Sequence, residues 1–145
     1  MSNLDLFRRD FILSIKPEYA ARIVEGLKTV ELRRRFPFGA ATDARMFVYA
    51  SAPVQALIGY ATILDVERRE IEEIWEKYSR VAFIKRSDFD KYFRDRTKGF
   101  VIRLGQPVRL VTPIALSTLK AELGFTPPQS FTYADDGLDR LLQPS

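Results

Sequence analysis

The sequence contains no cysteine and no histidine among its 145 residues. The absence of cysteine excludes disulfides and thiolate chemistry. The absence of histidine removes the side chain that most often serves as a general base and as a metal ligand. Because zinc sites built from carboxylates alone are uncommon, we expect no metal site and no cofactor. Any acid–base chemistry must use Asp, Glu, Lys or Tyr.

Long apolar runs are also missing. No stretch approaches the roughly 18 apolar residues that a transmembrane helix requires. The segment 1–10 alternates acidic and basic residues and lacks the apolar centre of a signal peptide. We therefore expect no membrane association and a cytoplasmic location.

The composition predicts one basic globular domain. Hydrophobic residues make up 46% of the chain and charged residues 29%, which suits a single core. The formal net charge is +4 and the sequence pI is about 9.5, so an anionic partner is favoured, nucleic acid first. We expect a single domain over 1–145, with an arm at 1–10, a core barrel at 11–115, and a C-terminal helix and tail at 116–145, of which 135–145 is expected to fray.

The hydropathy pattern predicts an α+β fold, a small mixed β-barrel of about five to six strands with short flanking helices. The expected strands are 11–16, 28–35, 45–51, 57–66, 99–104 and 108–111, the last two separated by a turn at 105–107. The expected helices are 17–25, 70–78, 87–94 and 117–123.

The second expected strand carries charge on one face. Residues two apart on a strand share a face, so Glu31 and Arg33 point the same way, while Val30 and Leu32 point toward the core. Lys28 opens this strand, and Lys16 ends the strand before it. These four charged side chains are candidates for one cleft; the alternative is a solvated strand face with weak ion pairs.

The order of these residues resembles a known family. The pattern Lys16-Pro17, a short helix, then Gly26-x-Lys28-x-x-Glu31-x-Arg33 resembles the ASCH domain family, which is related to the PUA domains of RNA-modifying proteins. The resemblance extends over roughly 11 to 115, through the segments 49–53, 57–61, 88–93 and 100–102.

The resemblance implies a PUA-like barrel with a polar cleft for RNA or a nucleotide-like ligand. One branch of the wider group hydrolyses the amide of an acetylated cytidine with a Lys, a Thr and a Glu. Its Lys matches Lys28, but its Thr falls at Glu31, so the nucleophile of that branch is missing here. Ribonuclease activity is also attributed to the family.

We assign candidate roles accordingly. Lys28 and Glu31 are the candidate catalytic residues, with Glu31 as base and Lys28 as electrostatic stabiliser. The candidate ligand-binding residues are Lys16, Arg33, Arg34, Ser51 and Tyr92. The cations suit phosphate or a base carbonyl, Ser51 is expected at the mouth of the cleft, and Tyr92 offers a phenol. A basic run over 85–98 predicts a solvated face or a wider positive rim.

Three functions remain open from the sequence. The first is an RNA- or nucleotide-binding domain acting in RNA metabolism or in the regulation of transcription or translation. The second is a hydrolase acting on RNA or a modified nucleoside. The third is a protein-interaction module that uses the segment 125–133 to contact a protein partner. The sequence does not decide whether the protein is an enzyme.

Overall fold

A computed structural model of the chain describes residues 9–37 and 41–142. Six strands form one mixed sheet in the order β2-β5-β4-β3-β1-β6. The strands are β1 (Phe11–Ile15), β2 (Val30–Arg33), β3 (Arg45–Ala50), β4 (Ala56–Glu70), β5 (Lys98–Ala115) and β6 (Phe131–Tyr133). The helices are α2 (Pro17–Val24), α3 (Ile71–Ala82), α4 (Arg86–Tyr92), α5 (Leu116–Leu123) and α6 (Leu138–Leu142).

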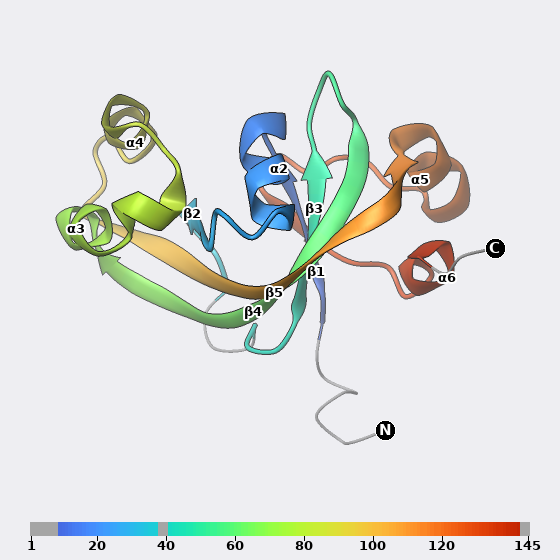
Figure 1. Cartoon of the computed structure of the whole chain (residues 1–145), viewed down its shortest axis with the longest axis horizontal. Helices are drawn as coiled ribbons and strands as arrows, with labels where there is room; N and C mark the ends of the chain where they lie inside the picture. The colour runs from blue at the N-terminus through green and yellow to red at the C-terminus, as the bar shows by residue number, and fades with distance from the viewer. Residues whose placement is uncertain (1–8, 38–40, 143–145) are drawn as a thin grey trace.

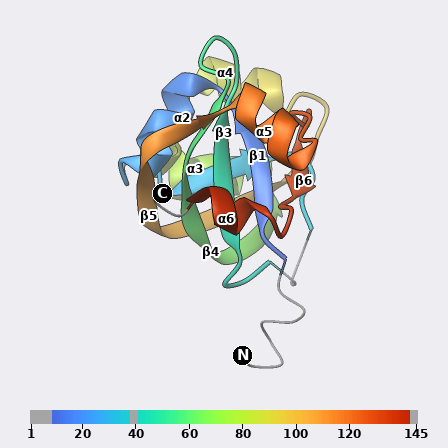
Figure 2. The ribbon, with the colours of Figure 1, turned by 90° about the vertical axis from the view of Figure 1, so that its right-hand side faces the viewer.

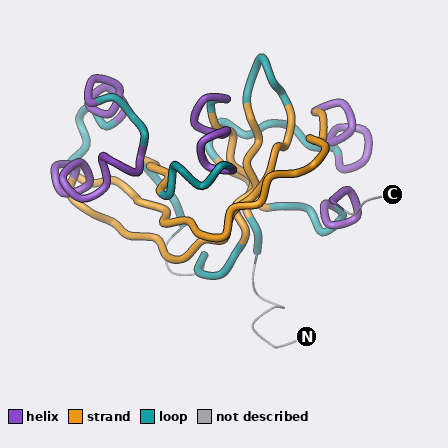
Figure 3. Tube along the Cα trace, viewed as in Figure 1, coloured by secondary structure: helices purple, strands orange, loops and turns teal. Residues whose placement is uncertain are grey.

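The sheet curls into a half-barrel. β1 pairs with β3 in parallel, and all other neighbouring strands are antiparallel. The two long strands, β4 and β5, bend together through the molecule, with α3 and α4 at one end and α5 and α6 at the other (Figures 1 and 3). The second view shows β1 and β3 side by side within the curled sheet (Figure 2). The predicted α+β, barrel-like fold is therefore confirmed.

The β1–α2–β2 unit follows from local sequence signals. Pro17 starts α2, where its missing N–H costs no helical hydrogen bond. Gly26 follows the helix with a φ of 82°, a conformation that side chains other than glycine seldom adopt. The predicted strand at 28–35 is shorter in the structure, because only Val30–Arg33 pair with β5.

Three apolar clusters hold the fold together, and the third positions β2. The first lies between α2 and the concave side of the sheet, and the second packs β1, β3 and β4 against α5 and α6. The third joins β2 and β5 to α3 and α4, and it contains Val30 and Leu32. The predicted burial of Val30 and Leu32 is confirmed, since they are 2% and 7% exposed.

The predicted turn at 105–107 is wrong, because β5 runs unbroken from Lys98 to Ala115. The register pairs Tyr60 with Val108 and Thr62 with Gly105, so two residues of β5 lie opposite one residue of β4. This is a β-bulge, and Pro107 lies within it, where the ladder does not need its missing N–H. In the sequence alone, a proline inside a bulge cannot be distinguished from a proline in a turn.

The tail is more ordered than predicted. The segment 131–133 forms β6 and pairs antiparallel with β1, and Leu138 of α6 is 2% exposed in the second cluster. The sheet therefore takes its sixth strand from beyond the predicted core barrel. No helix in the described part of the chain is long and apolar enough to cross a bilayer.

Candidate functional site

A pocket of about 470 Å³ opens between β1 and β2. These strands are not neighbours in the sheet, but its curl brings them toward each other. The lining residues come from β1, α2, β2, α4 and the segments beside them: Ser14, Ile15, Lys16, Tyr19, Lys28, Glu31, Leu32, Arg33, Ile84, Asp88, Lys91, Tyr92 and Gln129. This volume lies within the usual range for small-molecule sites.

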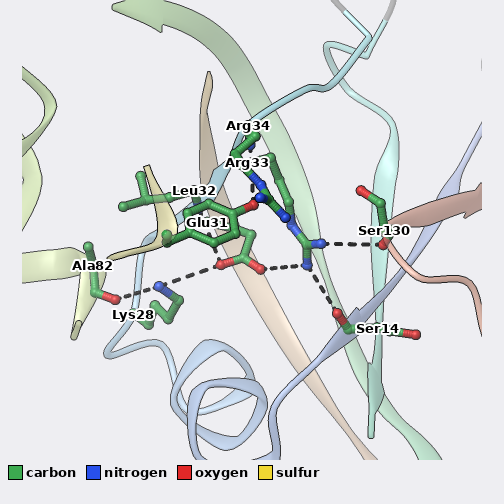
Figure 4. Close-up of polar contacts among 9 residues, drawn as sticks. Ser14, Lys28, Glu31, Leu32, Arg33, Arg34, Ala82 and Ser130 are labelled. Carbon is green, nitrogen blue, oxygen red and sulfur yellow. Dashed lines mark hydrogen bonds and ion pairs between the residues drawn. The ribbon is translucent and has the colours of Figure 1, made fainter. Parts of the chain in front are cut away.

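Three buried charges lie in a row in this pocket (Figure 4). Glu31 Oε2 accepts a hydrogen bond from Arg33 Nη2 at 2.9 Å, and Glu31 Oε1 lies 3.6 Å from Lys28 Nζ. Lys28 also donates to the carbonyl of Ala82, the last residue of α3. A helix C-terminus carries partial negative charge, so it suits an ammonium group. Each charge in the row therefore has a partner of opposite sign.

Arg33 also connects separate parts of the sheet. Its Nη2 donates to the Ser14 carbonyl of β1 at 3.1 Å, and its Nη1 donates to the Ser130 carbonyl before β6 at 3.4 Å. Its Nε is buried and has no hydrogen-bond partner among the described residues. The hydroxyl of Ser14 is buried without a partner as well. Unpaired buried polar groups are costly, and both residues belong to the lining of the pocket.

Glu31 is held ionised by its neighbours. Burial alone raises the pKa of a carboxyl group, but the charges of Arg33 and Lys28 oppose that effect. The hydrogen bond from Arg33 and one from the Leu32 N–H add to the lowering. The net pKa of Glu31 lies below its ordinary value, so at neutral pH the group is an acceptor and a weak base.

The pKa of Lys28 is shifted in the direction that favours the neutral amine. Burial is the main cause that lowers the pKa of Lys28, and the adjacent Glu31 only partly compensates. The lysine is 4% exposed, and its Nζ lies 5.5 Å from the centre of the Tyr19 ring. Lys28 therefore combines a lowered pKa with a place at the pocket wall, the combination expected of a lysine that moves protons.

The remaining walls are partly apolar and aromatic. Tyr19 of α2 and Tyr92 of α4 line the pocket together with Ile15, Leu32 and Ile84. Both tyrosines are partly exposed, while Tyr19 also packs against the first cluster and Tyr92 against the third. The rim carries exposed polar groups: Lys16, Asp88, Lys91 and Gln129. The pocket therefore combines a charged floor, partly aromatic walls and a lysine at its rim.

The structure brings most of the predicted site residues together. Lys16, Lys28, Glu31, Arg33 and Tyr92 all line the pocket. The functional roles assigned to them stay predictions.

Arg34 and Ser51 lie outside the lining set of the pocket. The Arg34 N–H donates to the Tyr92 hydroxyl at 3.2 Å, but the Arg34 side chain faces the neighbouring hollow described below. Ser51 follows β3, and its N–H donates to the carbonyl of Ile15. The ligand-binding role of Ser51 stays a prediction.

Several residues that line the pocket are not among the predicted site residues, notably Ser14, Tyr19 and Gln129. Ser14 carried a local signal, since it is the one polar residue in the β1 segment Phe11–Ile15. No local sequence signal indicated Gln129, because its position at the pocket depends on where β6 joins the sheet. Among the described residues no group of acidic side chains could hold a metal ion.

Comparison with known proteins indicates the family of the chain. Residues 10–118 match the model of a family described as a domain of unknown function, DUF365. An ASCH domain-containing ribonuclease from Zymomonas mobilis is 38% identical over 129 residues, which cover 87% of this chain and 84% of the relative.

Solved structures agree with the sequence matches. The crystal structure of ASCH from Zymomonas mobilis superposes with a TM-score of 0.86 at 34% identity, covering 92% of each chain. Human THYN1 in complex with 5-methylcytosine-containing DNA superposes with a TM-score of 0.52 at 15% identity, covering 92% of this chain and 95% of that one. The second likeness concerns the fold alone.

Proposed function

The chain belongs to the ASCH domain family, and from this premise we propose that it binds RNA and takes one nucleotide of that RNA into the pocket between β1 and β2. The observation that carries the proposal is a pocket whose floor holds the buried charges of Lys28, Glu31 and Arg33 and whose walls are partly aromatic. The ribonuclease name of the Zymomonas mobilis relative supports RNA over other anions.

The base and the phosphate of a nucleotide each have a counterpart in the pocket. The rings of Tyr19 and Tyr92 offer faces on which a base stacks, an interaction worth about 1–3 kcal/mol per base. The guanidinium of Arg33, at the floor of the pocket, offers a donor to a base carbonyl. Lys16, exposed at the rim, suits the phosphate.

Calorimetric titration tests this proposal. The four ribonucleoside monophosphates and a short single-stranded RNA are titrated into the wild type and into Tyr92→Leu and Lys16→Ala. The matched control is Lys120→Ala, an exposed lysine of α5 outside the pocket. We expect about ten-fold weaker binding in the pocket variants and no change in the control. Binding of no RNA by the wild type at low salt would refute the proposal.

A second candidate function is cleavage of the bound RNA, and the position of Lys28 favours it. In a cleavage that uses no water, the ribose 2′-oxygen attacks the adjacent phosphorus, the P–O5′ bond breaks, and a 2′,3′-cyclic phosphate remains. One proton leaves the 2′-hydroxyl and one joins the departing 5′-oxygen. A lysine with a lowered pKa is able to take the first proton, and Lys16 and Arg33 offer positive charge to the phosphate.

In this scheme we give the role of base to Lys28 in place of Glu31. Both oxygens of Glu31 are already engaged, one with Arg33 and the other with the Leu32 N–H and Lys28. Its lowered pKa also makes it a weak base. Glu31 acts as a positioning residue that holds the two cations apart at fixed places.

Cleavage is tested with a labelled single-stranded RNA and mass spectrometry of the product ends. We expect cyclic phosphate ends from the wild type and at least a hundred-fold loss in Lys28→Met. An equally active Lys28→Met variant that keeps its thermal stability would rule out the lysine as the base.

A further inference from the structure

A second hollow lies beside the pocket and is lined by cations. It has a volume of about 790 Å³, larger than the pocket itself. The segment after β2, strand β4, the loop after α4 and the start of β5 contribute to it. Its basic residues are Arg34, Arg35, Arg68, Arg94, Arg96 and Lys98.

None of these six cations forms an ion pair within residues 9–37 and 41–142, although pairs are frequent elsewhere on the protein. The contrast is clearest on β4, where Arg69 binds Glu67 at 2.6 Å while its neighbour Arg68 has no carboxylate partner in the described part of the chain. All six are exposed. The charges are therefore free to meet an anion from outside.

The hollow concentrates the positive charge of the protein. Six cations against the single carboxylate of Asp95 leave +5 there, more than the formal +4 of the whole chain. Like charges in one concave surface repel one another, and a concave surface focuses the potential that attracts an anion. Such a cluster is disfavoured in the free protein and relieved by a polyanion.

The hollow and the pocket share a wall. Arg34 lines the hollow, Tyr92 lines the pocket, and the two touch through a hydrogen bond and through the Arg34 guanidinium, which lies 4.8 Å from the centre of the Tyr92 ring. A chain that leaves the pocket at this wall enters the hollow directly. Arginines suit such a path because each guanidinium binds phosphate in a forked geometry.

We infer that the hollow is a phosphate track, which holds the backbone of the nucleotides next to the one in the pocket. The inference rests on the proposed function and specifies its ligand as a single-stranded RNA of several nucleotides, in place of a free nucleotide. The pocket recognises one nucleotide, and the track contributes affinity that is independent of sequence.

The test compares two variants of equal net charge. The track variant is Arg68→Gln/Arg94→Gln/Arg96→Gln, and the control is Arg80→Gln/Lys120→Gln/Arg140→Gln, whose three cations are exposed and lie outside both hollows. Affinity for single-stranded RNAs of increasing length, from a mononucleotide upward, is measured by fluorescence anisotropy at about 50 and about 200 mM salt.

Three lost phosphate contacts lower the slope of log affinity against log salt by about 2, since each contributes about 0.7 for single strands. The ratio of the RNA affinity of the wild type to that of the track variant should therefore fall about 20-fold between about 50 and about 200 mM salt. Wild-type affinity should rise with RNA length, and that of the track variant should rise less, because three of the six cations remain. Because the three arginines repel one another, the track variant should also unfold at or above the wild-type temperature.

Two results would overturn the track. One is an equal loss of salt slope in the track and control variants, which would indicate net charge alone. The other is a wild-type affinity that does not increase with length, which would leave the pocket as a site for small nucleotides. Failure of the proposed function gives a different result, because the wild type then binds neither the mononucleotide nor any RNA. That result would refute the track as well.

Discussion

Arg33 Nη2 donates to the carbonyl of Ser14 at 3.1 Å, joining β2 at one edge of the sheet to β1 near the other. The same guanidinium binds Glu31 at 2.9 Å and the carbonyl of Ser130 at 3.4 Å. One residue that is 9% exposed therefore helps to close the half-barrel and forms part of the floor of the pocket. Substitutions here test the fold and the site together.

Replacement of Arg33 by lysine should show that its shape matters more than its charge. A lysine keeps the charge but has no planar fork to reach three acceptors at once. We expect Arg33→Lys to lower the free energy of unfolding by about 2 kcal/mol, and hydrogen exchange in β6 to become faster. Arg140→Lys in α6 is the control. Unchanged exchange in β6 would refute the closing role.

Glu31→Gln should destabilise the protein by about 3 kcal/mol in urea denaturation. Two buried cations lose their shared counter-charge, and breaking a buried ion pair is costly. Glu122→Gln, on the exposed side of α5, should change stability by less than about 0.5 kcal/mol. Equal stability of the two variants would contradict the central role of Glu31.

The pH dependence of stability should identify the same carboxylate. The pKa of Glu31 is lower in the folded than in the unfolded chain, so the unfolded chain binds its proton first as pH falls. The stabilisation is complete above about pH 4.3 and is lost as pH falls through the lower folded value. The gap in urea midpoint between wild type and Glu31→Gln should shrink over that range. A gap that stays constant down to about pH 2 would be inconsistent with this shift.

Ser14→Ala separates ligand binding from structure. The hydroxyl is buried without a partner, so its removal should leave the free energy of unfolding unchanged or raise it by up to about 1 kcal/mol. If the hydroxyl bonds to the base, the same variant should bind mononucleotides about ten-fold more weakly. Calorimetry and urea denaturation on one preparation measure both quantities. A variant that binds as well as the wild type would remove Ser14 from the site.

If Lys28 is the base of RNA cleavage, the pH–rate profile should report its titration. Burial keeps the pKa of Lys28 below its ordinary value, so the reactive neutral amine is present at lower pH than for a free lysine. The rate should rise with pH and reach a plateau below about pH 10.4. A rate that stays constant from about pH 6 to 9 would indicate another base.

The sequence by itself determined the local frame of the site. Pro17 and Gly26 set the ends of α2 through backbone conformation alone, and the period of two in β2 put Glu31 and Arg33 on one face. These are properties of a few consecutive residues, so the pattern was sufficient to predict them. The apolar partners Val30 and Leu32 were found by the same reasoning.

Only the tertiary structure decided which distant residues contact the side chains of this local frame. Ser130 lies 97 positions from Arg33, and Ala82 lies 54 positions from Lys28, so no local pattern links them. The order and curl of the sheet bring β1, β6 and the end of α3 to β2, and they separate Ser51 from the pocket. Long-range packing determines which groups contact a buried charge, because a side chain becomes buried only when segments that are distant in the sequence pack together.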